Sequence, residues 1–329
     1  MSLESSARLG HLELETSLLA ASSSATSRLK DLQDLNRTAV GAIIIKSGTM
    51  LEREGNPETN YYSDGRLVVN AKGLPGPDID GTMSMLEEFN TERTKPIILS
   101  LAGMKPEEYL QLVHTVRDSI GKTFDGVELN LSCPNVEGKP IISYDPEATE
   151  GIAKEILTEF PGLCLGVKIA PFFTEEMQSD LRGEIQTHLN RVNSGWSVEF
   201  DNQVFHGEEE LSRLAGVTNK LRPLGMRFVS ATNTFPNCRL LDRSGRPIIN
   251  PRANLGRAGL SGHFLRSISI ANVRTLKAAL QPEISIIGTG GVADRATADQ
   301  FFVVGADMVA IGSALVDRGP KAVQQIFLD

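Results

Sequence analysis

The stretch Ile284–Leu315, ISIIGTGGVADRATADQFFVVGADMVAIGSAL, contains two short apolar segments joined by a glycine-rich turn and a helical pattern. The segments Ile284–Gly288 and Met308–Gly312 are apolar nearly throughout, which is typical of parallel strands covered on both faces. Between them, Ala293–Val303 has the periodicity of an amphipathic helix. A strand–helix–strand unit of this kind predicts an α/β protein with a parallel sheet.

Six further apolar segments of the same kind precede this unit along the chain. They are Ser17–Ser22, Gly41–Lys46, Pro96–Ala102, Gly126–Leu131, Leu163–Ala170 and Arg227–Asn233. Helical patterns occur at Lys105–Ile120, Pro146–Phe160, Ser269–Leu280 and Pro320–Phe327. Eight strands alternating with helices predict a closed (β/α)8 barrel, the TIM barrel, with a doubly wound open sheet as the alternative.

Two segments are longer than a minimal barrel requires. Leu51–Arg93 predicts a long excursion between the second strand and the second helix. The segment of about 174–226 predicts an insertion between strands 5 and 6, with helices at Glu175–Val192 and Gly207–Arg222 flanking a hairpin around Ser197–Phe205. Loops of this length usually carry function. We expect one barrel domain over residues 1–329, with the insertion built into it.

Composition narrows the class of protein. Of 329 residues, 40% are hydrophobic, and the formal net charge is −8, so we expect a globular protein that does not bind nucleic acid. The chain contains no run of roughly 18 apolar residues, so we expect no membrane span. The three cysteines have no metal-ligand spacing, which favours a reducing, cytoplasmic location and no metal site.

Polar side chains gather where the predicted strands end. They are Lys46, Ser47, Asn130, Cys133, Lys168, Asn233 and Thr234. In a parallel barrel all strand ends meet on one face, where the βα loops build the active site. These residues therefore predict an active site rather than a purely structural face.

The two last strands are followed by glycine-rich turns. Gly288–Gly291 (GTGG) precedes a helix, and Gly312–Ser313 follows the last strand. Exposed backbone N–H groups at these positions predict a phosphate-binding cradle. The alternative is that the glycines serve only to make tight turns.

Cys133 and Lys168 are the candidate reactive residues. Cys133 stands at a loop opening, where a thiol can act as base or nucleophile if its pKa is lowered, whereas Cys164 lies inside a strand and reads as an inert core residue. Lys168 lies within the apolar run LGVKIA, so it needs a negative partner, either a carboxylate or an anionic cofactor.

Several motifs resemble the dihydroorotate dehydrogenase family, and class 1A in particular. They are AIIIKSGT with LEREGNP (Ala42–Pro57), VNAKGLPG (Val69–Gly76), SLAGM (Ser100–Met104), ELNLSCPNVEGKP (Glu128–Pro140), GVKIAP (Gly166–Pro171), SATNT (Ser230–Thr234), GLSG with SIANVR (Gly259–Arg274) and IIGTGGV with DMVAIGSAL (Ile286–Leu315). The resemblance covers residues 17 to 328. The cysteine in ELNLSCPN marks class 1, because class 2 members carry a serine base and an N-terminal membrane helix pair.

The resemblance implies an FMN-dependent oxidation of (S)-dihydroorotate to orotate in pyrimidine biosynthesis, with fumarate as the electron acceptor. Cys133 is implied to remove the C5 proton while the C6 hydride passes to N5 of FMN. Lys168 is implied to stabilise the reduced flavin. The resemblance also implies a homodimer. We further expect Pro134–Pro140 to cover the substrate as a mobile lid, since the thiol must exclude water yet admit ligand.

The same resemblance implies the binding residues. Substrate binding is implied for Lys46, Asn70, Asn130, Asn135, Asn233 and Thr234, together with the backbone of Lys72, Gly73 and Leu74. FMN binding is implied for Ala21, Ser22, Lys46, Ser47, Asn130 and Lys168, and for Gly262, Gly290, Gly291, Gly312 and Ser313 at its phosphate.

Departures from the class 1A pattern leave other functions open. Ser23 and Gly76 replace a glycine and an asparagine, Lys72 replaces an apolar residue, and the segment after strand 5 is longer. One alternative is a homologous FMN oxidoreductase that acts on another cyclic amide or enoate. A second alternative is a catalytically inactive FMN-binding or interaction protein.

Overall fold

Eight parallel strands close into a barrel in the computed structural model, which describes residues 2–132, 141–201, 205–250, 252 and 254–328. The strands are β3 (Leu18–Ala20), β4 (Ala42–Ile44), β7 (Ile97–Leu101), β8 (Gly126–Asn130), β9 (Leu165–Ile169), β11 (Met226–Ala231), β14 (Ser285–Thr289) and β15 (Met308–Ile311). Their order around the barrel is β11-β14-β15-β3-β4-β7-β8-β9. Each strand lies within or within a residue of its predicted segment, so the (β/α)8 barrel is confirmed and the open sheet is excluded.

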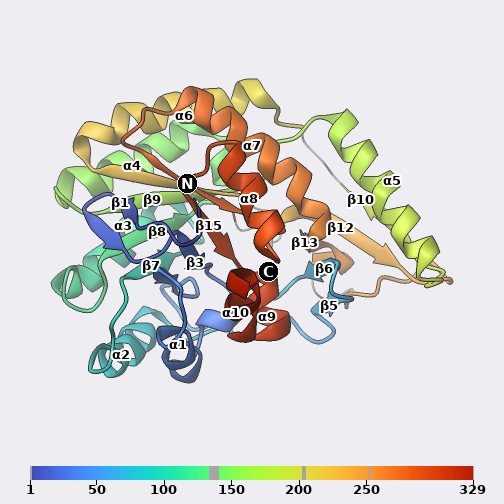
Figure 1. Cartoon of the computed structure of the whole chain (residues 1–329), viewed down its shortest axis with the longest axis horizontal. Helices are drawn as coiled ribbons and strands as arrows, with labels where there is room; N and C mark the ends of the chain where they lie inside the picture. Colours follow the sequence, from blue (N-terminus) through green and yellow to red (C-terminus); the bar gives the residue numbers. More distant parts are fainter. Residues whose placement is uncertain (1, 133–140, 202–204, 251, 253, 329) are drawn as a thin grey trace.

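Helices surround the barrel (Figure 1). They are α1 (Leu29–Asn36), α2 (Ile79–Asn90), α3 (Pro106–Val116), α4 (Pro146–Glu159), α6 (Glu208–Leu221), α7 (Arg266–Ala279), α8 (Arg295–Val303), α9 (Ser313–Arg318) and α10 (Lys321–Leu328). Proline at the first position begins α3 and α4, where its missing N–H costs nothing. Within the described ranges, no helix has both the length and the apolar character needed to cross a membrane.

A short hairpin closes the barrel at the end where the strands begin. It consists of β1 (Ala7–Leu9) and β2 (Leu12–Leu14), which the sequence analysis did not identify. Leu9 and Leu14 pack against Phe228 inside the barrel, and Cys164 donates to the Leu9 carbonyl oxygen over 3.6 Å. Burial raises the pKa of Cys164 to about 12, so this thiol is the inert core residue that its place in the strand predicted.

A second, antiparallel sheet stands beside the barrel mouth. Its order is β10 (Ser197–Phe200), β12 (Phe235–Leu241), β13 (Ala258–Gly262), β6 (Leu67–Asn70) and β5 (Tyr61–Ser63). The strands come from three separate excursions, which follow β4, β9 and β11. Figure 1 shows them between the barrel and α5 (Glu175–Arg191), whose apolar residues Leu181, Ile185 and Leu189 belong to the core of this sheet.

The insertion differs from the expected arrangement in two respects. The strand β10 pairs with β12 in the register Phe200↔Cys238, not with a second strand of a local hairpin around Ser197–Phe205. Val198 and Phe200 are buried with Phe235 in the core of the second sheet, so long-range packing decides the pairing. In addition, α6 packs between α4 and α7 as a regular helix of the barrel, so α5 and β10 are the described elements of the insertion that extend beyond it.

Candidate active site

A cavity of about 570 Å³ opens where the ends of the barrel strands face the second sheet. It is lined by sixteen of the predicted site residues: Ala21, Ser22, Lys46, Ser47, Asn70, Lys72, Leu74, Asn130, Lys168, Asn233, Thr234, Gly262, Gly290, Gly291, Gly312 and Ser313. Gly73 lies in the same loop as Lys72 but does not line the cavity. Cys133, Asn135 and the predicted lid at Pro134–Pro140 lie outside the described residues.

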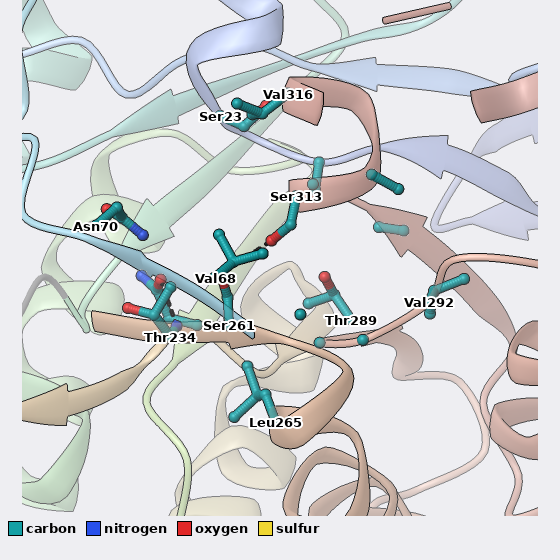
Figure 2. A pocket seen from close by; sticks show the side chains of 18 of the residues that line it. Ser23, Val68, Asn70, Thr234, Ser261, Leu265, Thr289, Val292, Ser313 and Val316 are labelled. Atoms are coloured by element: carbon teal, nitrogen blue, oxygen red, sulfur yellow. Dashed lines mark hydrogen bonds between the residues drawn. The ribbon is translucent and has the colours of Figure 1, made fainter. Parts of the chain in front are cut away.

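Two different structural layers form the walls of this cavity. Figure 2 shows Asn70, Thr234 and Ser261 on the side of the second sheet, and Thr289 and Ser313 at the ends of β14 and β15. The hydroxyl of Ser313 donates to Ser261 Oγ over 2.9 Å and joins the two walls. The cavity therefore exists only because the excursions fold back over the strand ends.

Glycines with positive φ line the end of the cavity near α8. The values are +77° at Gly262, +117° at Gly290 and +85° at Gly291, a region that favours glycine. At Gly291 a Cβ atom would lie 2.7 Å from Arg266 Cβ, so the close approach of the chain also requires glycine. Such a loop presents backbone N–H groups to the cavity, as a phosphate cradle does.

Ser47 links three polar groups at the floor of the cavity. Its Oγ lies 3.4 Å from Ser22 Oγ and 2.9 Å from Ser100 Oγ, and it accepts from Asn130 Nδ2 over 3.2 Å. The Lys168 side chain, which is 8% exposed, lines the same cavity. Lys168 and Lys46 thus place two cations on a floor of hydroxyl and amide groups.

The two central asparagines hold each other in place. Asn233 Nδ2 donates to Asn130 Oδ1 over 3.2 Å and to Ser132 Oγ over 2.9 Å, while its own Oδ1 accepts from the backbone N–H of Thr234. These bonds fix the orientation of both amides. A planar ligand with N–H and C=O groups on its edge can therefore meet donors and acceptors that are already oriented.

The loop after β6 turns its carbonyl groups away from the cavity. The carbonyls of Ala71 and Lys72 accept from Asn56, and that of Gly73 accepts from Arg53 Nε over 3.1 Å. Among the residues that the structure describes, no acceptor bonds the backbone N–H groups of Lys72, Gly73 or Leu74. These N–H groups are therefore available to a bound anion.

Two departures from the class 1A pattern have structural explanations. Lys72 lines the cavity with its Nζ 5.1 Å from the centre of the Tyr61 ring, so it adds a cation to the cavity lining beside β5. Burial, followed by hydrogen bonding to Asp317, raises the pKa of Tyr61, which keeps the phenol neutral. Ser23 has extended backbone and caps the turn Ser24–Thr26, so a side chain is tolerated there without strain.

Several titratable lining residues were missed by the sequence analysis: Tyr61, Arg66, His263, Arg266, Asp294, Asp317 and Arg318. Burial and the fields of Arg266 and Arg66 lower the pKa of His263, so the neutral ring can accept from Arg66 over 2.8 Å. Charged residues in loops leave no periodic signal. Only the position of Arg266 next to the quoted motif GLSG could have indicated its place at the cradle.

This site suits a particular kind of cofactor. Glycines at the strand 7–8 position provide a phosphate cradle, two lysines compensate negative charge, and hydroxyl and amide groups can bond a planar polar ring. The fold and site therefore define a (β/α)8-barrel oxidoreductase that fits a phosphate-bearing flavin.

Comparison with known proteins identifies the family. The family model described as dihydroorotate dehydrogenase matches residues 5–212 and 210–329. The chain therefore belongs to the dihydroorotate dehydrogenase family of flavin-dependent oxidoreductases that act on CH–CH bonds.

The relatives are fumarate-type members of class 1A. The chain is 32% identical over 302 residues to dihydroorotate dehydrogenase A (fumarate) of Lactococcus lactis subsp. lactis, covering 91% of this chain and 84% of the relative. It is 33% identical over 299 residues to a putative dihydroorotate dehydrogenase A (fumarate) of Streptococcus agalactiae serotype Ia, covering 90% and 83%. It is 34% identical over 297 residues to dihydroorotate dehydrogenase (fumarate) of Lachancea kluyveri, covering 88% and 80%. The resemblance to class 1A is confirmed.

Proposed function

We propose that this protein oxidises (S)-dihydroorotate to orotate with FMN as cofactor and fumarate as electron acceptor, in the cytoplasm and as a homodimer. One observation carries the proposal. A single cavity combines a glycine cradle, the cation of Lys168 and a pair of oriented amides at Asn130 and Asn233. The relatives named as fumarate-type dihydroorotate dehydrogenases support the same reaction.

In the proposed cofactor half of the cavity, glycines and one serine would hold the phosphate. Gly262, Gly290 and Gly291, with Gly312 and Ser313, would hold the phosphate of FMN through backbone N–H groups and one hydroxyl. Bound FMN supplies the acceptor for the hydride from C6 of the substrate. Lys168 would stabilise the negative charge that develops during the transfer, a preorganised electrostatic effect.

The substrate half is built from amides and backbone. Asn70, Asn130 and Asn233 would bond the edge of the pyrimidine ring, and the free N–H groups of the loop at Lys72–Leu74 would bind its carboxylate. Cys133 would remove the C5 proton as the general base. This role, like that of Asn135, is supported by the motif ELNLSCPN rather than by geometry.

An anaerobic absorbance titration tests the proposal. The purified protein, loaded with FMN, is titrated with dihydroorotate while the visible flavin band is recorded. Bleaching of the band, followed by recovery on addition of fumarate, is the expected result. A flavin band that is unaffected by dihydroorotate but bleaches with a chemical reductant would reject the substrate while keeping the cofactor. A protein that takes up no FMN would reject both.

A second candidate is a homologous oxidoreductase for another cyclic amide or enoate, and Lys72 is the observation that favours it. The Lys72 ammonium lies in the substrate half of the cavity, over Tyr61. A substrate with a second anionic group would gain from it. The second candidate is supported if Lys72→Met is reduced faster by dihydroorotate and the natural enzyme is reduced faster by a doubly anionic analogue. The inactive alternative requires that neither dihydroorotate nor the analogue reduces the flavin of the natural protein.

A further inference from the structure

A carboxyl group is sealed in the barrel interior below the cavity. Glu128 belongs to β8, its side chain is 0% exposed, and Ser230 on β11 donates to its Oε2 over 2.6 Å. Its register partners are Ser100 on β7 and Gly166 on β9. No hydrogen-bond partner for Oε1 is found among the described residues. The proposed reaction gives this carboxyl no role.

Lys168 is the charged neighbour of this carboxyl. It pairs in register with Asn130 on β8 and with Ser230 on β11, so it lies one step above Glu128, toward the cavity. Within the described ranges, the other groups that act on the carboxyl are the hydroxyls of Ser230 and Ser100. Burial raises the pKa of Glu128, while the field of Lys168 and the two hydroxyls oppose that rise only in part.

A row of hydroxyl groups leads from this carboxyl to the cavity. Ser100, the register partner of Glu128 and one of the hydroxyls that lower its pKa, is the first member, and its Oγ lies 2.9 Å from Ser47 Oγ. Ser47 Oγ lies 3.4 Å from Ser22 Oγ, and both of these serines line the cavity. Each hydroxyl can donate and accept, so the row can carry a proton between the cavity and the barrel interior.

We propose that Glu128 is a redox-linked proton site, which binds one proton from water when the cofactor above Lys168 is reduced. The proposal rests on the proposed flavin site. A hydride brings two electrons and one proton to the flavin ring, which gains one negative charge. That charge and the carboxylate of Glu128 are both stabilised by the cation of Lys168. Protonation of the carboxylate neutralises one of the two negative charges, so reduction of the flavin favours it. Glu128 touches neither cofactor nor substrate, so it is a positioning residue that acts through Lys168.

The midpoint potential of the FMN-loaded protein, measured against pH with redox dyes, tests the proposal. The matched variant is Glu128→Gln, which is of equal size and cannot bind the proton. One extra proton per two electrons steepens the slope by about 30 mV per pH unit, so the natural protein should show this added slope over a window that the variant lacks. Identical slopes over the whole pH range in which both proteins stay folded would overturn the proposal.

Two further measurements protect this test against a variant that fails to fold. Ser230→Ala removes a hydrogen bond that lowers the Glu128 pKa, so it should move the steep window to higher pH. Infrared difference spectra between the reduced and the oxidised FMN-loaded protein should show a protonated carboxyl band on reduction that Glu128→Gln lacks; absence of this band from the natural protein would overturn the proposal. Because dyes replace dihydroorotate, a wrong substrate assignment leaves the result intact, whereas a protein that takes up no FMN rejects the flavin site itself before any slope is measured.

Discussion

Gly290 lies so close to Ser269 that a Cβ atom at Gly290 would stand 2.2 Å from the Ser269 Oγ. The backbone φ at Gly290 is also +117°, where side chains are strained. We expect Gly290→Ala to lower the free energy of unfolding by about 1–3 kcal/mol and to weaken FMN binding, because the cradle must shift. Calorimetry and fluorescence titration with FMN measure the two effects.

The matched control is Gly216→Ala, because Gly216 lies in α6 and a Cβ atom there meets nothing within 4 Å. Alanine in a helix interior should raise stability by roughly 0.5–1 kcal/mol and leave FMN affinity unchanged. Equal FMN affinity in both variants would mean that the loop at Gly290 does not bind the phosphate.

Lys168→Met should leave FMN bound but slow its reduction by dihydroorotate. The loss of one preorganised charge typically costs about 10²–10³ in rate. Stopped-flow absorbance under anaerobic conditions measures the rate. Lys95→Met is the control, since Lys95 is also largely buried but pairs with Glu15. If the two variants are reduced at equal rates, Lys168 has no special role.

Asn233→Ala should weaken dihydroorotate binding and lower kcat/KM. The change removes one ligand contact and frees the Asn130 amide to rotate, because the bond between their side chains is lost. Loss of such hydrogen bonds costs about 1–3 kcal/mol, or roughly 5- to 150-fold. Steady-state kinetics measure the effect, with Asn190→Ala on the surface of α5 as the control. An unchanged KM for dihydroorotate would place the substrate elsewhere.

Cys133→Ala should bind FMN normally but slow its reduction by about 10²–10⁴, the usual contribution of a general base. Cys133→Ser should restore part of the rate at high pH, since a hydroxyl is a weaker acid than a thiol. Cys164→Ala tests for a general thiol effect: it should lower stability, because Cys164 is packed against the β1–β2 hairpin, and keep the reduction rate. A fast Cys133→Ala enzyme would exclude Cys133 as the base.

The ion pair between Asp64 and His188 should make stability depend on pH. Burial raises the pKa of Asp64, but bonds from His188 and from the N–H groups of Leu67 and Arg66 outweigh it and hold the pKa below 3.8. The resulting stabilisation is present above that ordinary value and is lost as the pH falls through the lower folded value. Thermal unfolding at several acidic pH values should show that the melting temperature falls less steeply with pH for Asp64→Asn than for Asp34→Asn on α1. Equal slopes would mean that the pair of Asp64 and His188 does not contribute to the pH dependence of stability.

The barrel could be predicted from sequence because its strands are buried on both faces. Their apolar character is continuous, and the helices between them have a regular period, so eight segments and four long helices were located within a few residues. The site residues at the strand ends followed from the same pattern, since every parallel strand must end on one face.

The second sheet could not be predicted in the same way. Its pairs, such as β10 with β12 and β13 with β6, join segments that are far apart in the chain. The strand at Ser197–Phe200 alternates correctly, but alternation does not identify a partner strand. The hairpin of β1 and β2 has only three residues in each strand, too few for a periodic signal.

The two walls of the cavity have different origins, and this separates two kinds of evolutionary change. Gly290, Gly291 and Gly312, which we propose to hold the phosphate, directly follow barrel strands, whereas Asn70 ends β6 of the second sheet and Lys72 stands on the loop after it. An altered or exchanged loop can therefore give a descendant enzyme a new substrate while it inherits the cofactor unchanged.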